Sequence, residues 1–146
     1  MNDNIIQFVK NQQCASICCT GPDGHPHCFS CFFAFNPEEG LLYFKTSAVS
    51  HHAVLMLNNP VIAGTILPDK LQVLAVKGVQ FSGYVLPILD PRIRDASKRY
   101  HRRYPFALAM PGEVWTIQLT HIKMTDSTIG IGKSIIWEKE EAAQLS

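Results

Sequence analysis

Hydrophobic and polar residues alternate over several stretches of the chain. The alternation is clearest over 114–124, where Trp115 and Ile117 fall on one side and Thr116 and Gln118 on the other. A period of two is typical of a β-strand with one buried face. Other stretches are rich in β-branched and aromatic residues and are bounded by Gly, Pro, Asn or Asp, which are turn residues. We predict strands over 15–20, 27–35, 41–46, 61–67, 71–86, 114–124 and 134–137.

Three segments favour short helices, because apolar residues recur in them at helical spacing or a capping residue precedes them. Asn2 or Asp3 can cap the first helix, Ser50 the second and Asp90 the third, where Pro91 follows at the first helical position. The second and third helices are each followed by a proline. The predicted helices cover 3–13, 50–58 and 90–104.

Short strands separated by three short helices favour an antiparallel sheet that closes into a small barrel, with the helices packed outside it. The long segment 71–86 is broken by Gly78 and Gly83, as expected of a strand that bends at a barrel corner. Glycine and proline are spread singly, and the chain contains no repeat or linker. We therefore expect residues 1–146 to form a single domain of the mainly β (α+β) class.

Composition excludes an intrinsically disordered chain, because 47% of the residues are hydrophobic and only 17% are charged. So much apolar surface on one small barrel suggests that a second copy covers part of it. Lys and Arg number 13 against 12 Asp and Glu, so the net charge of +1 provides no overall field toward nucleic acid or an acidic membrane. Any phosphate site must therefore be local.

The sequence shows no secretory leader and no apolar run approaching the roughly 18 residues of a membrane span. We therefore expect a cytoplasmic protein. In that compartment cysteines are reduced, and an odd number at irregular spacing is not typical of a disulfide framework. The five cysteines, expected as thiols, are Cys14, Cys18, Cys19, Cys28 and Cys31.

Cysteine and histidine also gather over residues 18–31, where Cys28 and Cys31 have the spacing of zinc ligands and His25 and His27 lie close by. On a strand, however, positions three apart point to opposite faces, which opposes tetrahedral convergence. Cysteine is also among the most buried residue types. We expect buried thiols and no metal, with a redox-active thiol pair as a further alternative.

The order of the elements resembles a known family. Together with four short segments, this order is similar to the FMN-binding split barrel of pyridoxamine-phosphate-oxidase-like proteins. The segments are Thr46-Ser47, Ser50-His51-His52, Asn59-Pro60 and the glycine-marked strand 78–83. Within that superfamily the second half resembles the uncharacterised YhbP-type group. The residues that carry this similarity are Gly78-Val79-Gln80-Phe81, Arg102-Arg103-Tyr104-Pro105, Val114-Trp115, Ile122-Lys123, Thr125-Asp126, Gly130, Gly132-Lys133 and Ile136-Trp137.

The resemblance implies a six-stranded antiparallel Greek-key split barrel with short flanking helices. It also implies a homodimer with two FMN sites at the subunit interface. The oxidase's C-terminal substrate motif, with its His and Arg, has no counterpart after Trp137, which argues against pyridoxamine-phosphate oxidation. The resemblance names no substrate.

The segment from Thr46 to His52 suits a phosphate on physical grounds alone. A strand that ends in Thr46 and Ser47 and turns into a helix at Ser50 presents free backbone N–H groups and the positive end of a helix dipole. The oxidase has Arg and Lys where this chain has His51 and His52. Histidine is mostly neutral at pH 7, so phosphate binding should be weaker or pH-dependent. The alternative is a capping serine followed by two surface histidines.

Three further residues are cofactor-binding candidates. Gln80 lies on the glycine-marked strand, where its amide could bond the flavin pyrimidine edge, although an outward-facing polar residue there is equally ordinary. The resemblance would bring Lys133 and Trp137 from the other subunit, the lysine toward phosphate or ribityl oxygens and the tryptophan against the ring. The alternative is a solvated lysine and an interface tryptophan.

The third predicted helix carries the basic cluster of the chain. Its charges surround the helix, so a solvated surface is expected, with an acidic partner or nucleic acid as the less favoured alternative. The cluster consists of Arg92, Arg94, Lys98, Arg99, His101, Arg102 and Arg103.

The sequence shows no nucleophile elbow, P-loop or paired-carboxylate motif. If the protein is an enzyme, we therefore expect a bound cofactor to carry out the catalytic chemistry. We predict a homodimeric FMN-binding protein, with flavin-dependent oxidoreductase activity as the enzymatic interpretation. A non-catalytic dimeric binding protein that has lost flavin is the alternative.

Overall fold

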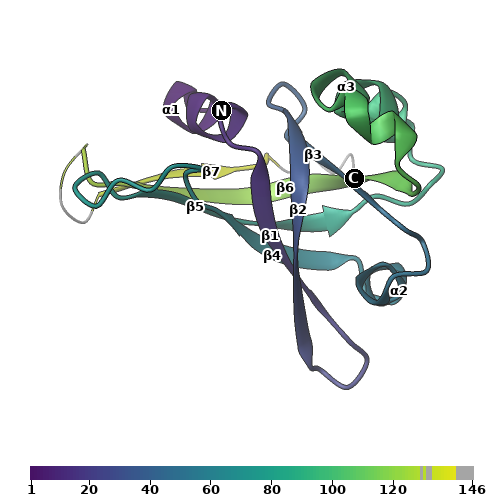
Figure 1. The fold of residues 1–146 in the computed structure, drawn as a ribbon. Coiled ribbons are helices and arrows are strands. Elements are labelled where there is room, and N and C mark those ends of the chain that lie inside the picture. Colours follow the sequence, from purple (N-terminus) through teal and green to yellow (C-terminus); the bar gives the residue numbers. More distant parts are fainter. Residues whose placement is uncertain (129, 131–132, 141–146) are drawn as a thin grey trace, which may run out of the picture.

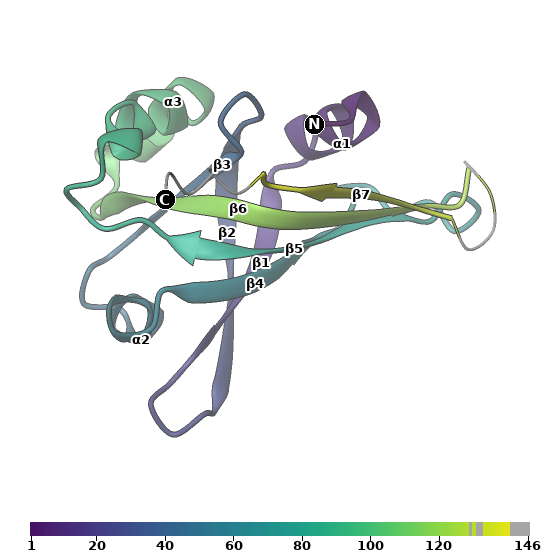
Figure 2. The same ribbon diagram turned by 180° about the vertical axis from the view of Figure 1, so that it is seen from behind.

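Seven strands form one antiparallel sheet in the computed structural model, which describes residues 1–128, 130 and 133–140 (Figures 1 and 2). The strand order is β3-β2-β1-β4-β5-β6-β7, and β3 also pairs with β6. This pairing closes β1 to β6 into a six-stranded barrel, and β7 is added to β6. The predicted fold class is confirmed. The strands are β1 Cys14–Thr20, β2 Pro26–Asn36, β3 Leu41–Thr46, β4 Val61–Ile66, β5 Lys77–Val85, β6 Glu113–Asp126 and β7 Ser134–Glu138.

Three α-helices lie outside the sheet, as the sequence predicted (Figure 1). The side chains of Asn2 and Ser50 cap the first two, as capping preferences indicate. The third predicted helix is divided. Asp90 caps a short 3-10 helix, and the α-helix begins only at Ala96. The helices are α1 Asp3–Lys10, α2 His51–Asn58 and α3 Ala96–Arg103, and the 3-10 helices are η1 Pro91–Ile93 and η2 Pro105–Ala109.

The interior of the barrel is the main hydrophobic core. It is filled from alternate positions of the strands and closed by α1 and α2, which contribute Phe8 and Met56. A second, smaller cluster lies between the outer side of β3 and α3, where Tyr43, Tyr100 and Tyr104 pack together. The Tyr104 hydroxyl donates to the carbonyl of Phe33 at 2.6 Å, which fastens this helix region to β2. The two clusters bury the two faces of β3, and the chain enters α2 shortly after this strand ends.

The predicted strand 71–86 is too long at its start. β5 begins at Lys77, and residues 67–76 form a connection in which Val73 and Leu74 are 93% and 97% exposed. At Gly83, one of the two glycines at which a bend was predicted, the pairing of β5 with β6 shifts register between Ser82 and Gly83. A Cβ on Gly83 would lie 2.2 Å from the carbonyl oxygen of Gln118, so only glycine allows the two backbones to approach this closely.

The expectation of five reduced cysteines is wrong. Cys18 and Cys28 are direct partners in the β1–β2 pairing and form a disulfide. The register that brings them together depends on the hairpin turn, and cysteine spacing alone does not reveal it. Of the three free thiols only Cys19 is buried, whereas Cys31 is half-buried and Cys14 is exposed.

Candidate functional site

The segment joining β3 to α2 forms a tight turn around the Ser50 hydroxyl. This hydroxyl accepts a hydrogen bond from the N–H of Ala53 at 3.3 Å and donates to the carbonyl of Ser47 at 2.8 Å. The Ser47 hydroxyl in turn accepts from the N–H of Val49. Ser50 therefore acts as the N-cap of α2, and its hydroxyl is occupied within the turn. Ser47 is exposed, so its own hydroxyl proton can reach a ligand.

His52 is held firmly within this turn. Its Nε2 lies 2.6 Å from the Thr46 hydroxyl, and its ring stacks on Phe29 with 3.8 Å between ring centroids. The Thr46 hydroxyl also lies 3.3 Å from the Ser50 hydroxyl, so Thr46, Ser50 and His52 lie together. Their contact with a cofactor remains a prediction. These contacts within the turn fix the imidazole at the end of β3, beside the first turn of α2.

A third histidine, named above only beside the cysteines and not as a phosphate ligand, completes the group. His27 on β2 lies with its ring centroid 4.8 Å from His51 and 6.4 Å from His52. We call His27, His51 and His52 the histidine cluster. His27 and Phe29 share one face of β2, and this alternation was the signal that could have linked His27 to the site. The cluster therefore joins two elements, β2 and α2.

The electrostatics of the cluster favour an anion. Burial lowers the pKa of His52 below its usual value, and the neighbouring His27 and His51 lower it further. His52 is therefore mainly neutral at pH 7. A negative group beside it would oppose both effects and favour the protonated imidazole.

Backbone donors add to the imidazoles. The N–H groups in the first turn of a helix lack intrahelical acceptors, and at α2 they belong to the residues of the cluster, His51 and His52. No acidic residue lies in the first turn of α2. The arrangement can therefore bind a phosphate or carboxylate through N–H groups, imidazole rings and the Ser47 hydroxyl.

An apolar cavity of about 790 Å³ lies beside the segment that joins β3 to α2, and Ala48 of this segment contributes to its lining. Met56 and Leu57 of α2, together with Trp115 of β6, provide much of its wall. Thr116 also lines it, and the Thr116 hydroxyl is buried with no hydrogen-bond partner among the described residues. An apolar ring that carries a polar atom matches such a lining.

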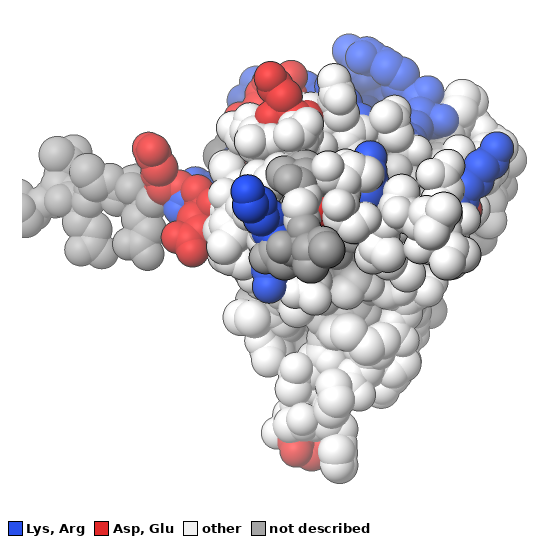
Figure 3. Space-filling model, turned by 90° about the vertical axis from the view of Figure 1, so that its left-hand side faces the viewer, with Lys and Arg blue, Asp and Glu red and all other residues white. Residues whose placement is uncertain are grey.

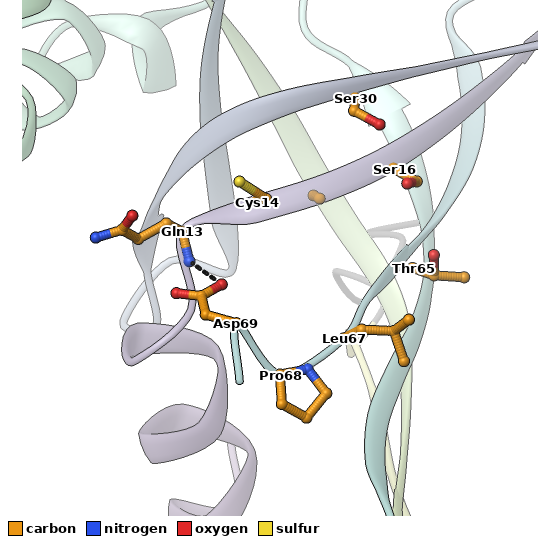
Figure 4. Close-up of a pocket in the computed structure, with 9 residues that line it drawn as sticks. Gln13, Cys14, Ser16, Ser30, Thr65, Leu67, Pro68 and Asp69 are labelled. Carbon is orange, nitrogen blue, oxygen red and sulfur yellow. Dashed lines mark hydrogen bonds between the residues drawn. The ribbon is translucent and has the colours of Figure 1, made fainter. Parts of the chain in front are cut away.

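Gln80 lies elsewhere. It is exposed on β5, opposite Thr65 of β4 and Lys123 of β6. Thr65 continues a row of hydroxyl residues across β4, β1 and β2, formed with Ser16 and Ser30. Figure 4 shows these three side chains lining a second, more open pocket of about 410 Å³. The strand register thus places Gln80 beside Thr65 of this pocket, and its contact with a cofactor remains a prediction.

The other two candidates lie near β7. Lys133 is exposed and precedes the strand. Trp137 is half-buried against the core of its own chain, where a Cβ on Gly40 would lie 3.0 Å from its ring. Neither is joined to the histidine cluster by a contact among the described residues. Contributions from a second subunit remain predictions.

The basic residues near α3 are partly engaged inside the molecule. Arg92 binds Asp90 and the Gln118 side chain, and Arg103 donates to the carbonyl of Gln12.

Within 1–128, 130 and 133–140, no group of three or more His, Cys, Asp or Glu is arranged to hold a metal. The helices of this part of the chain are too short or too polar to cross a membrane.

No family model matches the sequence. The fold is similar to that of a haem-binding protein from Mycobacterium smegmatis, with a TM-score of 0.73 and 12% identity over 90% of this chain. This chain spans 55% of the mycobacterial protein, or about half its length. The fold is also similar to that of an FAD-binding protein from Mesorhizobium loti, with a TM-score of 0.66 and 14% identity, covering 86% of this chain and 95% of that one. At such identities the similarity shows the fold alone.

The sequence itself has closer relatives. It is 35% identical over 138 residues to a UPF0306 protein of Photorhabdus laumondii, which covers 94% of this chain and 96% of that protein. A UPF0306 protein of Yersinia pestis is 31% identical over 137 residues. The similarity extends across the strands of the barrel and the segment that carries the histidine cluster. The chain belongs to the UPF0306 family.

Proposed function

We propose that the protein binds FMN, with the phosphate held by the histidine cluster and the first turn of α2. The observation that carries the proposal is the gathering of three imidazoles around free helix N–H groups with no acidic residue in that turn. Histidines packed together repel one another when protonated, and an anion between them removes that penalty. The FAD-binding protein of similar fold supports a flavin, although it does not identify FMN.

The residues present fit this cofactor. The phosphate would contact His51, His52 and the Ser47 hydroxyl, while Thr46 orients His52 and Ser50 shapes the turn. The apolar cavity with the unpartnered Thr116 hydroxyl suits a flat ring with polar edges. Bound flavin would supply two-electron redox chemistry. The protein would bind and orient it and exclude water, as a flavin-dependent oxidoreductase whose substrate is undefined.

The protein is further proposed to be a cytoplasmic homodimer of the YhbP type. Large apolar side chains are exposed, among them Val49, Leu74 and Leu89 at 87%, 97% and 91%. On the face shown in Figure 3, a few charged side chains are scattered among uncharged ones. A second copy would cover such surface and could bring Gln80, Lys133 and Trp137 to the cofactor. Sedimentation should return a dimer at micromolar concentration, and a monomer would contradict an intersubunit site.

Haem is the second candidate. The similarity of fold to a haem-binding protein and the ability of imidazole to ligate iron both favour it. A dimeric binding protein without redox activity is the alternative to an enzyme.

Titration of the purified protein separates these functions. FMN should bind tightly enough to quench its fluorescence, riboflavin should bind more weakly because it lacks the phosphate, and hemin should show no Soret shift at equal concentration. A Soret shift with no flavin binding would favour haem. Failure of both ligands to bind would leave the non-catalytic function. If FMN binds, reduction by NADH or NADPH tests the oxidoreductase.

A further inference from the structure

The hairpin of β1 and β2 extends beyond the rest of the sheet as an arm (Figures 1 and 2). β1 pairs with β4 only over Ser16 to Cys18, so residues 19–27, which we call the arm, are paired only within the hairpin. The turn is closed by a hydrogen bond of 3.0 Å from the Gly21 N–H to the His25 carbonyl. An isolated two-stranded hairpin is only marginally stable in water. Beyond its own pairing, the arm is held through Cys19, which is buried in the main core, and through His27, which lies beside His51 of α2.

The disulfide lies at the base of this arm. Cys18 is the last β1 residue paired with β4, and Cys28 is its direct partner on β2. The bond joins residues ten positions apart, so it closes the arm into a small loop and removes open conformations. Cys28 is exposed and Cys18 half-buried, so a reductant can reach the sulfurs.

The same place carries the contacts between β2 and α2. His27 and Phe29 flank Cys28, with His27 beside His51 and Phe29 stacked on His52 at 3.8 Å. Their side chains project from the face of β2 opposite to that of Cys28. The disulfide thus lies between the two residues through which β2 contributes to the histidine cluster, and it fixes the backbone from which both project.

We propose that Cys18–Cys28 is a site of thiol–disulfide exchange, and that its reduction by a dithiol loosens the arm and weakens anion binding at the histidine cluster. A thiolate of the dithiol attacks one sulfur, forms a mixed disulfide and releases the other as a thiolate. The second thiol of the reductant then displaces the first protein sulfur. The protein gains two electrons and two protons as two thiols, and the dithiol becomes a disulfide. A disulfide oxidant reverses the reaction.

The remaining cysteines are poor substitutes for this pair. Burial raises the pKa of Cys19, and it raises the pKa of Cys31 to about 12, so neither forms the reactive thiolate readily. Cys14 is exposed, but it lies four residues from Cys18 along β1, about 13 Å away at the rise of a strand. Exchange is therefore confined to Cys18 and Cys28 while the barrel is folded.

The first test measures the thiols and the arm in the full-length protein. After oxidised dithiothreitol, a cyclic disulfide that does not cap single thiols, alkylation of the unfolded protein should label the three free cysteines, and after reduced dithiothreitol all five. Hydrogen exchange of the amides in 19–27 should become faster on reduction, while those of β3 and β6 stay protected. Five labelled cysteines after oxidation would overturn the proposal. Equal hydrogen-exchange rates of the arm amides in the oxidised and the reduced protein would show that reduction does not loosen the arm.

The second test uses FMN and therefore depends on the proposed function. Reduction should raise its Kd about three- to tenfold, because the site is complete only while the arm is closed. Cys18→Ser/Cys28→Ser should bind like the reduced protein in either buffer, and Cys14→Ser should keep the full redox response. An FMN affinity independent of redox state would overturn the coupling. Hydrogen exchange of the arm that depends on redox state, with no FMN binding, would overturn the proposed function and the coupling. It would still support Cys18–Cys28 as the site of thiol–disulfide exchange.

Discussion

Replacing His52 with alanine tests the phosphate site through a single side chain. The change removes an imidazole that is fixed by a 2.6 Å contact with Thr46 and by stacking on Phe29. A hydrogen bond to a charged group contributes about 1.5–3 kcal/mol. The Kd for FMN should therefore rise about 10- to 150-fold. Riboflavin has no phosphate, so its Kd should change by less than about threefold, within the spread expected of indirect effects.

Flavin fluorescence quenching measures both ligands under identical conditions. His25→Ala is the matched control, because His25 is exposed at the hairpin turn, where its recorded side-chain contact is with Asp23. This variant should bind both flavins as the wild type does. Thermal unfolding of each variant shows whether the barrel is intact. Equal losses of FMN and riboflavin affinity in His52→Ala would refute the phosphate contact.

The same variant has a pH signature. Burial and the neighbouring histidines lower the pKa of His52 in the free protein, and a bound phosphate would raise it. Binding then takes up a proton, so wild-type affinity should increase as the pH falls from about 7 toward the lowered pKa. The second pKa of the phosphate, near 6, limits the increase. In His52→Ala the slope should be smaller, and an unchanged slope would assign the proton to another group.

Three further predictions concern the scaffold. Gly83→Ala should destabilise the barrel by about 2–4 kcal/mol in urea unfolding, whereas Gly78→Ala should change stability by less than about 0.5 kcal/mol, because its Cβ meets only ordinary contacts. Tyr104→Phe should cost about 1 kcal/mol and remove a phenol whose pKa burial raises to about 12, seen by alkaline absorbance titration. Arg92 lowers the pKa of Asp90 to about 2. The wild type should therefore lose free energy of unfolding as the pH falls from 4 to 2, and Asp90→Asn should lose less over the same range.

Each of these has a contradicting result. Equal stability of the two glycine variants would show that the β5–β6 approach is not tight. Wild-type stability in Tyr104→Phe, with the lost phenol titrating near the ordinary tyrosine pKa, would contradict the buried hydrogen bond to Phe33. For Asp90 the sign is fixed, because the folded carboxyl holds its proton less tightly than the unfolded one and its stabilisation fades as the pH falls. An identical acid transition in Asp90→Asn would exclude that contribution.

Local sequence signals predicted most of the barrel. The bounds of β3 and the Ser50 cap of α2 depend on neighbouring residues only, and both were found as predicted. The start of β5 was misplaced because Val73 and Leu74 have strand-like composition but lie exposed in a connection. Burial there is decided by the path of the chain, which composition does not reveal.

Features that join distant segments were the ones missed. The disulfide requires the register that places Cys18 opposite Cys28, and spacing arguments favoured free thiols. His27 reaches His51 only because the hairpin extends beyond the sheet beside α2. The part of the predicted site that is contiguous in sequence was assembled, from Thr46 to His52. Gln80, Lys133 and Trp137 lie on other elements, where one chain does not bring them to the cluster.

A crystal structure of the protein with FMN would show directly where the phosphate binds. We expect the phosphate at the first turn of α2, with oxygens about 2.7–3.1 Å from the N–H groups of the turn and from an imidazole nitrogen of His52. The His27 ring should border the same phosphate. FMN bound with its phosphate away from α2 would contradict the account, as would density at the histidine cluster for a ligand without an anionic group.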